Sequence, residues 1–290
     1  MKILFAGSGG MVGSAVIRHS IECGHEVIRL VRQTPGPGEV WWNPDAGEID
    51  AAGLEGFDGV VHLTTMRWPP QWTDEAKQQI RANRLTTNGL LAKTVANCTR
   101  KPEVLVCASG MGFYPSSGDD IITEECACGT SWLATLQRDG EAATVPAGAA
   151  GIRVVNLRIP PVVARNSIEQ GANVIGSGRQ WVSWIARDEL ASIIEHVLVC
   201  DAVTGPVNPV SPNPLRNADY AATVARVLGR EPGGPVPEGM LLSMLGEMGE
   251  EFVLASRRMQ PAKLLATGYR FRFPELEQAL RHEMGRVDAG

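Results

Sequence analysis

Three glycines at positions 7, 10 and 13 constrain the fold of this 290-residue chain more than any other feature. They follow a short apolar run, Ile3 to Ala6, and precede a helical pattern that begins at Met11. Glycines there let the backbone come within contact distance of a pyrophosphate, and the free N–H groups and positive dipole of a helix start stabilise its charge. A glycine triplet alone is weak evidence, but a preceding strand and a following helix are the context that a nucleotide site requires. We therefore predict a dinucleotide-binding site, with a tight buried turn as the alternative.

The residue after the second predicted strand distinguishes between the two nicotinamide cofactors. That strand covers Glu26 to Val31, and Arg32 follows it. An NAD site usually carries an acidic residue here for the ribose 2′-hydroxyl, whereas an arginine suits the additional 2′-phosphate of NADP. Arg32 therefore favours NADP(H). The alternative is a solvated arginine at a strand end.

The composition is that of an ordinary globular protein. Hydrophobic residues make up 44% and charged residues 20% of the sequence, which suffices for one large or two closely joined domains. The net charge of −5 and the scattered lysines and arginines argue against a nucleic-acid surface, which needs a clustered basic face. The first apolar run is too short for a signal peptide, and no stretch approaches the roughly 18 apolar residues of a membrane span. We expect a cytoplasmic protein without a membrane or nucleic-acid partner.

The six cysteines form no recognisable pattern of metal ligands or disulfides. They are spread along the chain, without paired C-x-x-C spacing. We therefore predict neither a metal site nor a disulfide framework.

Strand-like apolar runs alternate with longer helical stretches, as expected of βα units in a parallel sheet. The runs expected to be buried strands are residues 60–63, 104–108 and 154–157. A long helix is expected from about Trp72 to Asn97. The predicted fold class is therefore α/β, with a Rossmann-type doubly wound parallel sheet. We expect a nucleotide-binding domain in residues 1–160 and a smaller substrate-facing region in residues 161–290, some segments of which return to the first domain.

The glycine spacing, Arg32 and the sequence His62-Leu63-Thr64-Thr65 resemble the extended short-chain dehydrogenase/reductase superfamily. Blocks in the C-terminal half are similar to its atypical SDR39U1-like (YfcH-like) epimerase family. These blocks are residues 176–181, 183–185, 208–212, 246–248 and 261–274. The resemblance spans nearly the whole chain, and the C-terminal blocks are more specific than the glycine triplet.

The resemblance implies an NADP(H) cofactor held by the glycine loop, the end of the second strand, the residues after the third strand and the long helix. The matching positions are Gly7, Ser8, Gly10, Met11, Val12, Gly13, Val31, Arg32, Leu63, Thr64, Thr65, Gln79 and Arg84. Arg84 shares a helix face with Ile80 and Leu91 and so needs an anionic partner, either the cofactor or a structural carboxylate. The family often has glycine where Thr65 stands, so the backbone approach is expected to differ there.

The tyrosine and lysine that transfer protons in most reductases of this superfamily are missing. In those enzymes a lysine four residues after the tyrosine lowers the pKa of its hydroxyl from about 10. The tyrosines Tyr114, Tyr220 and Tyr269 are instead followed four positions later by Gly118, Val224 and Phe273. The related family also commonly lacks the pair.

Three positions depart from the pattern of that family. Gly140 precedes Glu141 where the family usually has Trp-Glu, and Ala186 replaces a histidine. The segment Arg165 to Ile175 is shorter than the usual loop. We therefore expect a reshaped pocket that lacks one polar group on its substrate side.

Ser109 is the strongest catalytic candidate because it directly follows the fourth predicted strand, at the end where open α/β sheets bind ligands. The superfamily places there a serine or threonine that hydrogen-bonds the substrate oxygen, so Ser109 is also expected beside the cofactor. A turn serine bonded to nearby backbone is the alternative. Tyr114 is a second candidate, as a proton donor, with aromatic packing under the loop as its alternative.

Two functions of different classes fit these features. In the first, an NADP(H)-dependent oxidoreductase or epimerase-like enzyme uses Ser109 to polarise a carbonyl of a small-molecule substrate, and water, Tyr114 or a substrate group supplies the proton. In the second, the chain binds NADP(H) without turnover, as a sensor or scaffold. The resemblance favours the enzyme. The oligomeric state stays open, although superfamily members often form homodimers through helices that match residues 72–97 and 133–149 here.

Overall fold

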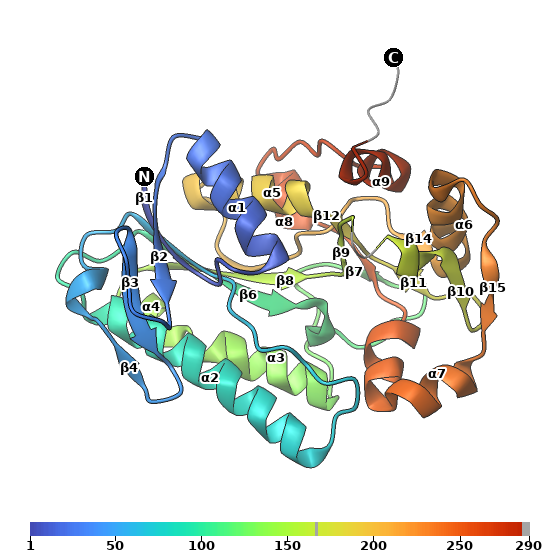
Figure 1. The fold of residues 1–290 in the computed structure, drawn as a ribbon, viewed down its shortest axis with the longest axis horizontal. Helices are drawn as coiled ribbons and strands as arrows, with labels where there is room; N and C mark the ends of the chain where they lie inside the picture. Colours follow the sequence, from blue (N-terminus) through green and yellow to red (C-terminus); the bar gives the residue numbers. More distant parts are fainter. Residues whose placement is uncertain (166–167, 286–290) are drawn as a thin grey trace.

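An eight-stranded sheet forms the centre of the computed structural model, which describes residues 1–165 and 168–285 (Figure 1). Its order is β13-β8-β6-β5-β1-β2-β3-β4, and all neighbours are parallel except β3 and β4. The strands are β1 (Lys2–Ala6), β2 (Glu26–Val31), β3 (Glu39–Asn43), β4 (Glu48–Ile49), β5 (Gly59–His62), β6 (Val104–Gly110), β8 (Arg153–Ile159) and β13 (Gly205–Val207). The three buried strands predicted from the sequence correspond to β5, β6 and β8.

Helices cover both faces of the sheet, because successive side chains of each strand point to opposite sides. In β1, Ile3 and Phe5 pack in one apolar layer, whereas Leu4 and Ala6 pack in the other. Figure 1 shows α1 and α5 on one face and α2, α3 and α4 on the opposite face. Their bounds are α1 (Met11–Glu22), α2 (Asp74–Asn97), α3 (Trp132–Ala142), α4 (Val145–Ala149) and α5 (Arg187–Val199). The predicted Rossmann-type doubly wound fold is confirmed.

The long helix α2 begins where the sequence provides a cap. Thr73 Oγ1 accepts a hydrogen bond from the Ala76 N–H at 3.3 Å. Asp74 and Glu75 then place negative charge at the positive end of the helix dipole. None of the described helices is long and apolar enough to span a lipid bilayer.

The order of the strands reverses beside β1. From β1 the chain continues to β2 and β3 on one side, and then crosses to β5, β6 and β8 on the other side. In open α/β sheets, the carboxyl ends of the strands at such a switch point form the ligand-binding crevice. Gly7 follows β1 and Ser109 lies in the last two residues of β6, so both lie at this edge of the sheet.

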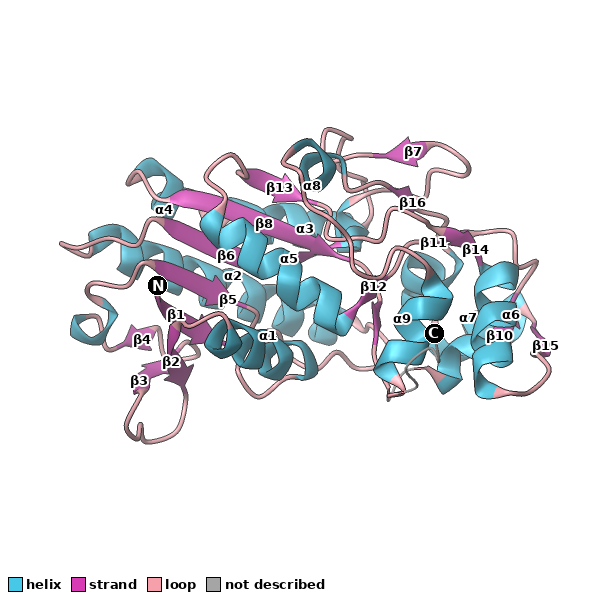
Figure 2. Cartoon of the chain, turned by 90° about the horizontal axis from the view of Figure 1, so that it is seen from above, coloured by secondary structure: helices cyan, strands magenta, loops and turns pink. Residues whose placement is uncertain are grey.

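The chain beyond residue 160 contributes to both parts of the molecule. Strand β13 and helix α5 complete the large sheet and one of its helix layers, and the remaining elements gather at its carboxyl edge (Figures 1 and 2). Those elements are β9 (Val162–Val163), β10 (Asn173–Ile175), β11 (Trp181–Val182), β12 (Ile185–Ala186), β14 (Leu215–Arg216), α6 (Asn217–Leu228), β15 (Gly233–Val236), α7 (Glu238–Leu245), β16 (Arg258–Met259) and α9 (Leu276–Glu283). Helix α8 (Ala262–Ala266) instead lies in the helix layer of α5, where Leu264 and Ile193 share one apolar core. Trp184, Val224 and Leu280 belong to their apolar core.

Short irregular elements complete the chain. Strand β7 (Ile121–Ile122) pairs with β16. The 3₁₀ helices cover Ala52–Leu54, Met111–Phe113 and Glu169–Ala172, and a π helix covers Gly249–Leu254. Residues 166–167 of the segment that the sequence marks as short lie outside the described residues.

Candidate functional site

The three loop glycines have different surroundings. Gly7 has a φ of +96°, and a Cβ atom there would lie 2.7 Å from the backbone carbon of Leu63. A Cβ at Gly13 would lie 2.1 Å from the carbonyl oxygen of Gly7. The nearest atom to a Cβ at Gly10 is 3.7 Å away, which is ordinary van der Waals distance. The first and third glycines therefore allow the close approach of β1, β5 and α1, while the side of Gly10 stays open to a ligand.

A cavity of about 370 Å³ lies beside this loop. Its lining residues are Gly7, Ser8, Gly9, Arg29, Leu30, Val31, Arg32, Gln33, Trp42 and Thr64. The side chain of Arg32 is 46% exposed and only loosely paired, with 3.5 Å between its Nη1 and Oδ2 of Asp45. The buried Oγ1 of Thr64 has no hydrogen-bond partner among the described residues. A loosely paired cation and an unpartnered hydroxyl group in one cavity fit the phosphates and ribose of a dinucleotide.

The structure places several of the expected cofactor residues together and separates one from them. Gly7, Ser8, Val31, Arg32 and Thr64 line the same cavity. The backbone of Leu63 lies against Gly7 of the loop, and Met11 and Val12 are the first residues of α1. The hydroxyl of Thr65 donates a hydrogen bond to the carbonyl of Met66. Gln79 is exposed, and in an α-helix it lies roughly 140° around the axis from Arg84. The two positions therefore lie on different faces of α2.

Arg84 is buried and supports the end of β6. Its Nη1 donates a hydrogen bond to the carbonyl of Ala108 at 2.9 Å. A Cβ at Gly140 would lie 2.9 Å from Cγ of Arg84, so the glycine makes room for the arginine stem. Burial lowers the pKa of Arg84, and the charge of Glu141 is among the influences that raise it. Arg84 thus fixes the backbone next to Ser109, and the glycine that departs from the family pattern is part of this arrangement.

Ser109 lies at one end of a buried chain of polar groups. Its Oγ donates to Oε1 of Glu141 at 2.7 Å. Arg158, from β8, donates from Nε to Oε1 and from Nη2 to Oε2 of that carboxylate, each at 3.0 Å. Burial opposes the charge of Arg158, but the ion pair with Glu141 outweighs it and raises the pKa of the arginine. Because the hydroxyl of Ser109 donates its hydrogen bond to Glu141, the serine oxygen can accept a hydrogen bond from a substrate hydroxyl.

Tyr114 lies inside the protein, with no exposed surface. Its hydroxyl donates to Oδ1 of Asn208 and accepts from Nη1 of Arg158, both at 2.8 Å. Burial is the main cause that raises the pKa of Tyr114 to about 12. The hydroxyl group of Tyr114 therefore donates its hydrogen to a structural hydrogen bond with Asn208.

A second cavity opens at the carboxyl ends of β6 and β8. It has a volume of about 300 Å³, and its lining residues are Met111, Pro161, Gly171, Asn173, Ile175, Trp181, Val182, Ser183, Asn217, Tyr220, Phe252, Val253, Ala255 and Arg257. Met111 comes two residues after Ser109, and Pro161 comes two residues after the end of β8. A mostly apolar cavity next to a polar strand end is typical of a small-molecule site.

Three residues that carry this site were not among the sequence candidates. Glu141 stands beside the noted departure at Gly140, and Arg158 is a charged residue in an apolar strand, which is a sign of a buried partner. No local sequence pattern indicated Arg257, which is held against the distant carbonyl of Tyr114.

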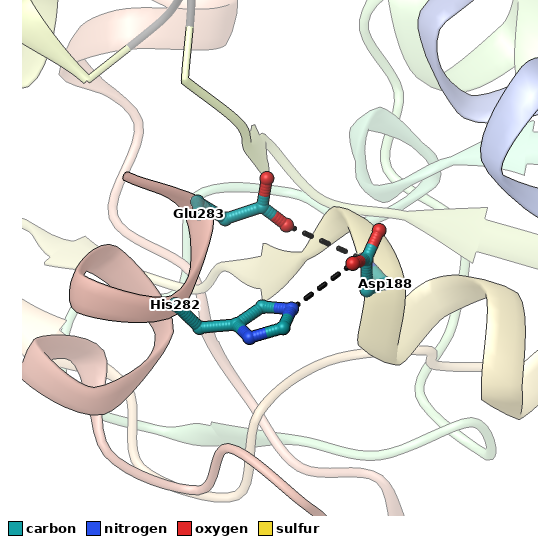
Figure 3. Close-up of side chains that lie close together, drawn as sticks. All are labelled: Asp188, His282 and Glu283. Atoms are coloured by element: carbon teal, nitrogen blue, oxygen red, sulfur yellow. Dashed lines mark hydrogen bonds and ion pairs between the residues drawn. The ribbon is translucent and has the colours of Figure 1, made fainter. Parts of the chain in front are cut away.

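A separate cluster of possible metal ligands joins α5 to α9. Figure 3 shows Asp188 facing His282 and Glu283. Nε2 of His282 lies 3.0 Å from Oδ2 of Asp188. Arg187 contacts Asp188 Oδ1 at 3.0 Å through Nε and Glu283 Oε2 at 3.2 Å through Nη2. Burial alone would raise the pKa of Asp188, but His282 and Arg187 lower it. The carboxylates are already paired with arginine, so we assign the cluster to packing of the two helices.

The doubly wound sheet and the glycine loop at its switch point define a dinucleotide-binding protein of the short-chain dehydrogenase/reductase type. The chain belongs to the NAD dependent epimerase/dehydratase family, whose model matches residues 3–207. Residues 236–283 match a domain of unknown function, DUF1731. The family predicted from the sequence motifs is confirmed, and the chain is an NAD(P)-binding protein.

Relatives and solved structures extend over the whole fold. The chain is 32% identical to epimerase family protein ML0860 of Mycobacterium leprae, over 98% of this chain and 96% of the relative. It resembles the crystal structure of human epimerase family protein SDR39U1, isoform 2, with NADPH, at a TM-score of 0.89 and 29% identity, covering 99% and 100% of the two chains. A nucleoside-diphosphate sugar epimerase from Corynebacterium glutamicum is similar at a TM-score of 0.83 and 33% identity, over 98% of this chain and 58% of that chain.

Proposed function

We propose that this chain is an NADP(H)-dependent oxidoreductase or epimerase-like enzyme that acts on a hydroxyl or carbonyl group of a small molecule. The observation that carries this proposal is the hydrogen bond from Ser109 to Glu141 at the carboxyl end of β6. It supplies a path for a proton where the usual tyrosine and lysine are missing. The loosely paired guanidinium of Arg32 and the NADPH in the structure of the human relative support NADP(H) over NAD(H).

The chemistry of the bound nicotinamide is to accept or donate a hydride. The protein moves the accompanying proton. Ser109 Oγ accepts the proton of a substrate hydroxyl while its own hydrogen passes to Glu141, and the reverse transfer protonates a carbonyl oxygen. Arg158 holds the carboxylate of Glu141 in place through two hydrogen bonds, with Oε1 of Glu141 directed at the serine hydroxyl. This role replaces the carbonyl-polarising serine expected from the sequence, because the serine hydrogen is already donated to Glu141.

A sensor or scaffold that binds NADP(H) without turnover is the second candidate. It is favoured by the missing Tyr-x-x-x-Lys pair and by the burial of Tyr114. The two candidates share the cofactor site and differ only at the proton path.

The test is turnover of a panel of alcohols and carbonyl compounds with NADP⁺ or NADPH, followed by nicotinamide absorbance. We expect Ser109→Ala and Glu141→Gln to lower the rate by about one hundred-fold each, because each removes a group that carries the proton. The affinity for NADPH, measured by calorimetry, should stay within about two-fold, a change of less than ~0.5 kcal/mol. Thermal unfolding controls for loss of the Glu141 ion pair.

Unchanged turnover in both variants would remove the proton path from the mechanism. Tight cofactor binding without turnover of any compound would favour the sensor.

A further inference from the structure

We propose that the substrate carries a carboxylate on a compact apolar body, and that Arg257 binds this carboxylate in the cavity of about 300 Å³. The proposal deepens the function above, since it names the class of molecule that enters the same site. It rests on the contacts of one buried guanidinium and on the chemistry of the surrounding walls.

Arg257 is held in place by neutral backbone groups, and no carboxylate of the described residues lies within hydrogen-bond distance of it. Its side chain is buried, with the residue 2% exposed. Nε donates to the carbonyl of Tyr114 at 2.9 Å, and Nη1 donates to the carbonyl of Glu251 at 2.7 Å. Among the described residues, the one carboxylate paired with it is Glu251, whose Oε2 is 3.8 Å from Nη2, too far for a hydrogen bond. Nη2 is therefore available to a ligand.

The charge of this arginine persists at neutral pH. Burial lowers the pKa of Arg257 to about 10, and the nearby carboxylate of Glu251 partly opposes that change. A buried cation with a free hydrogen-bond donor gains most from an anionic ligand, because a neutral ligand leaves the charge uncompensated.

The residues that line the cavity determine which chemical groups the rest of the ligand can carry. Arg257 is the only charged side chain among the described residues that line it, and most of the other lining residues are apolar. Tyr220 also lines the cavity, and its hydroxyl forms no hydrogen bond with the described residues. One cation, one free hydroxyl and apolar walls suit a carboxylate on an aryl or branched alkyl body.

A third cavity, of about 170 Å³, shares the lining residues Ala255 and Arg257 with the cavity of about 300 Å³. Glu250 and Glu251 line this smaller cavity and repel an anion there. The carboxylate therefore belongs on the larger, apolar side. A nucleoside-diphosphate sugar carries two phosphates and a polar sugar, and this lining offers its charges a single guanidinium.

The proposal is tested by calorimetric titration of the whole protein with 3-phenylpropionate, 3-phenylpropanol and UDP-glucose, with and without NADP⁺. The first two ligands share a ring and chain and differ in the carboxylate. We expect 3-phenylpropionate to bind about ten-fold more tightly than the alcohol. Equal binding of the two, tighter binding of UDP-glucose, or no binding of any of them would overturn the proposal.

Variants of the lining residues show which side chains cause the preference for a carboxylate. Arg257→Gln should bring the affinity of 3-phenylpropionate to within about two-fold of that of the alcohol, and Arg257→Lys should keep part of the preference. Because Arg257 also supports two loops, Tyr220→Phe is a second variant that removes only a hydroxyl, and it should weaken 3-phenylpropionate by about three-fold. Arg226→Gln, an exposed arginine paired with Glu277, is the charge-matched control and should change nothing.

A carboxylate preference that survives in both Arg257→Gln and Tyr220→Phe would contradict the assignment. These titrations require no turnover, so a catalytically silent protein would still reveal the binding preference. Failure of the proposed enzyme function is thereby distinguished from failure of this proposal.

Discussion

At the scale of single residues, the loop glycines differ in whether a side chain would collide with the protein backbone. Gly13 lies against the carbonyl of Gly7, and no side chain fits between them. Gly10 faces open space at the start of α1. Three residues with one sequence spacing therefore have two different functions.

This difference predicts opposite phenotypes for two alanine variants. Gly13→Ala should lower the free energy of unfolding by about 2 kcal/mol or more, because its Cβ overlaps backbone. Gly10→Ala should stay within about 1 kcal/mol of wild type. Its affinity for NADPH should fall about ten-fold, because the methyl group occupies the approach of the pyrophosphate. Chemical denaturation and calorimetry measure the two effects, and wild-type cofactor affinity in a stable Gly10→Ala protein would contradict this account of the loop.

His62, the last residue of β5, makes the stability depend on pH. Burial, followed by the charge of Arg84, lowers the pKa of His62 from 6.5 to about 4. Between these values the unfolded chain binds the proton and the folded protein does not. The stabilisation is therefore complete above pH 6.5 and is lost as the pH falls through about 4, a loss of about 3 kcal/mol.

His62→Gln should flatten this part of the profile when unfolding by denaturant is compared at a series of pH values. The remaining titratable groups contribute equally to the pH dependence of unfolding in both proteins, so their contributions cancel in the difference. Parallel profiles for the two proteins would show that the folded state protonates His62 as readily as the unfolded chain does.

At the scale of elements, the packing of α2 against α3 depends on a glycine. Gly140 on α3 faces the stem of Arg84 on α2, whereas Gly89 on α2 has no atom within 4 Å of an added Cβ. Both glycines are inside helices, where alanine is intrinsically preferred by roughly 0.5–1 kcal/mol. Substitution by alanine is therefore expected to change the free energy of unfolding in opposite directions at the two positions.

Gly89→Ala should raise the free energy of unfolding by about 0.5 kcal/mol or more. Gly140→Ala should lower it by about 1 to 2 kcal/mol, since its methyl group displaces the buried arginine. Denaturant unfolding of both variants makes the comparison. An equal stabilisation by both alanines would mean that α2 and α3 are not in close contact at this point.

The sequence predicts most of the elements but few of the contacts in the site. The βα alternation, the capped start of α2 and the glycine loop are local patterns, and local physics determines them. Ser109 and Glu141 are 32 residues apart, and Arg257 and the Tyr114 carbonyl are 143 residues apart. No local pattern indicates such pairs, because only the sheet topology brings them together. For the same reason, the sequence left open whether Tyr114 donates a proton or packs under the loop, and the fold buries it.

At the scale of the whole molecule, aromatic side chains join the sheet to the C-terminal region. Trp68, Trp72 and Trp132 lie with ring centroids 4.9 to 6.4 Å apart, and Trp68 also lies 6.4 Å from Phe252. Lys77 forms an ion pair with Glu247 beside them. Phe252 also lines the larger cavity, so the shape of that cavity depends on how the C-terminal region sits against the sheet.

The central claim is that the whole fold presents a site selective for the phosphate of NADP(H). Calorimetric titration with NADPH and NADH tests it most directly, with Arg29→Ala as the control for Arg32→Ala, since both arginines line the same cavity. We predict that the wild-type protein and Arg29→Ala bind NADPH about ten-fold or more tightly than NADH, a difference of ~1.4 kcal/mol, and that Arg32→Ala loses the preference. Equal affinities of the wild-type protein for the two cofactors would contradict the account.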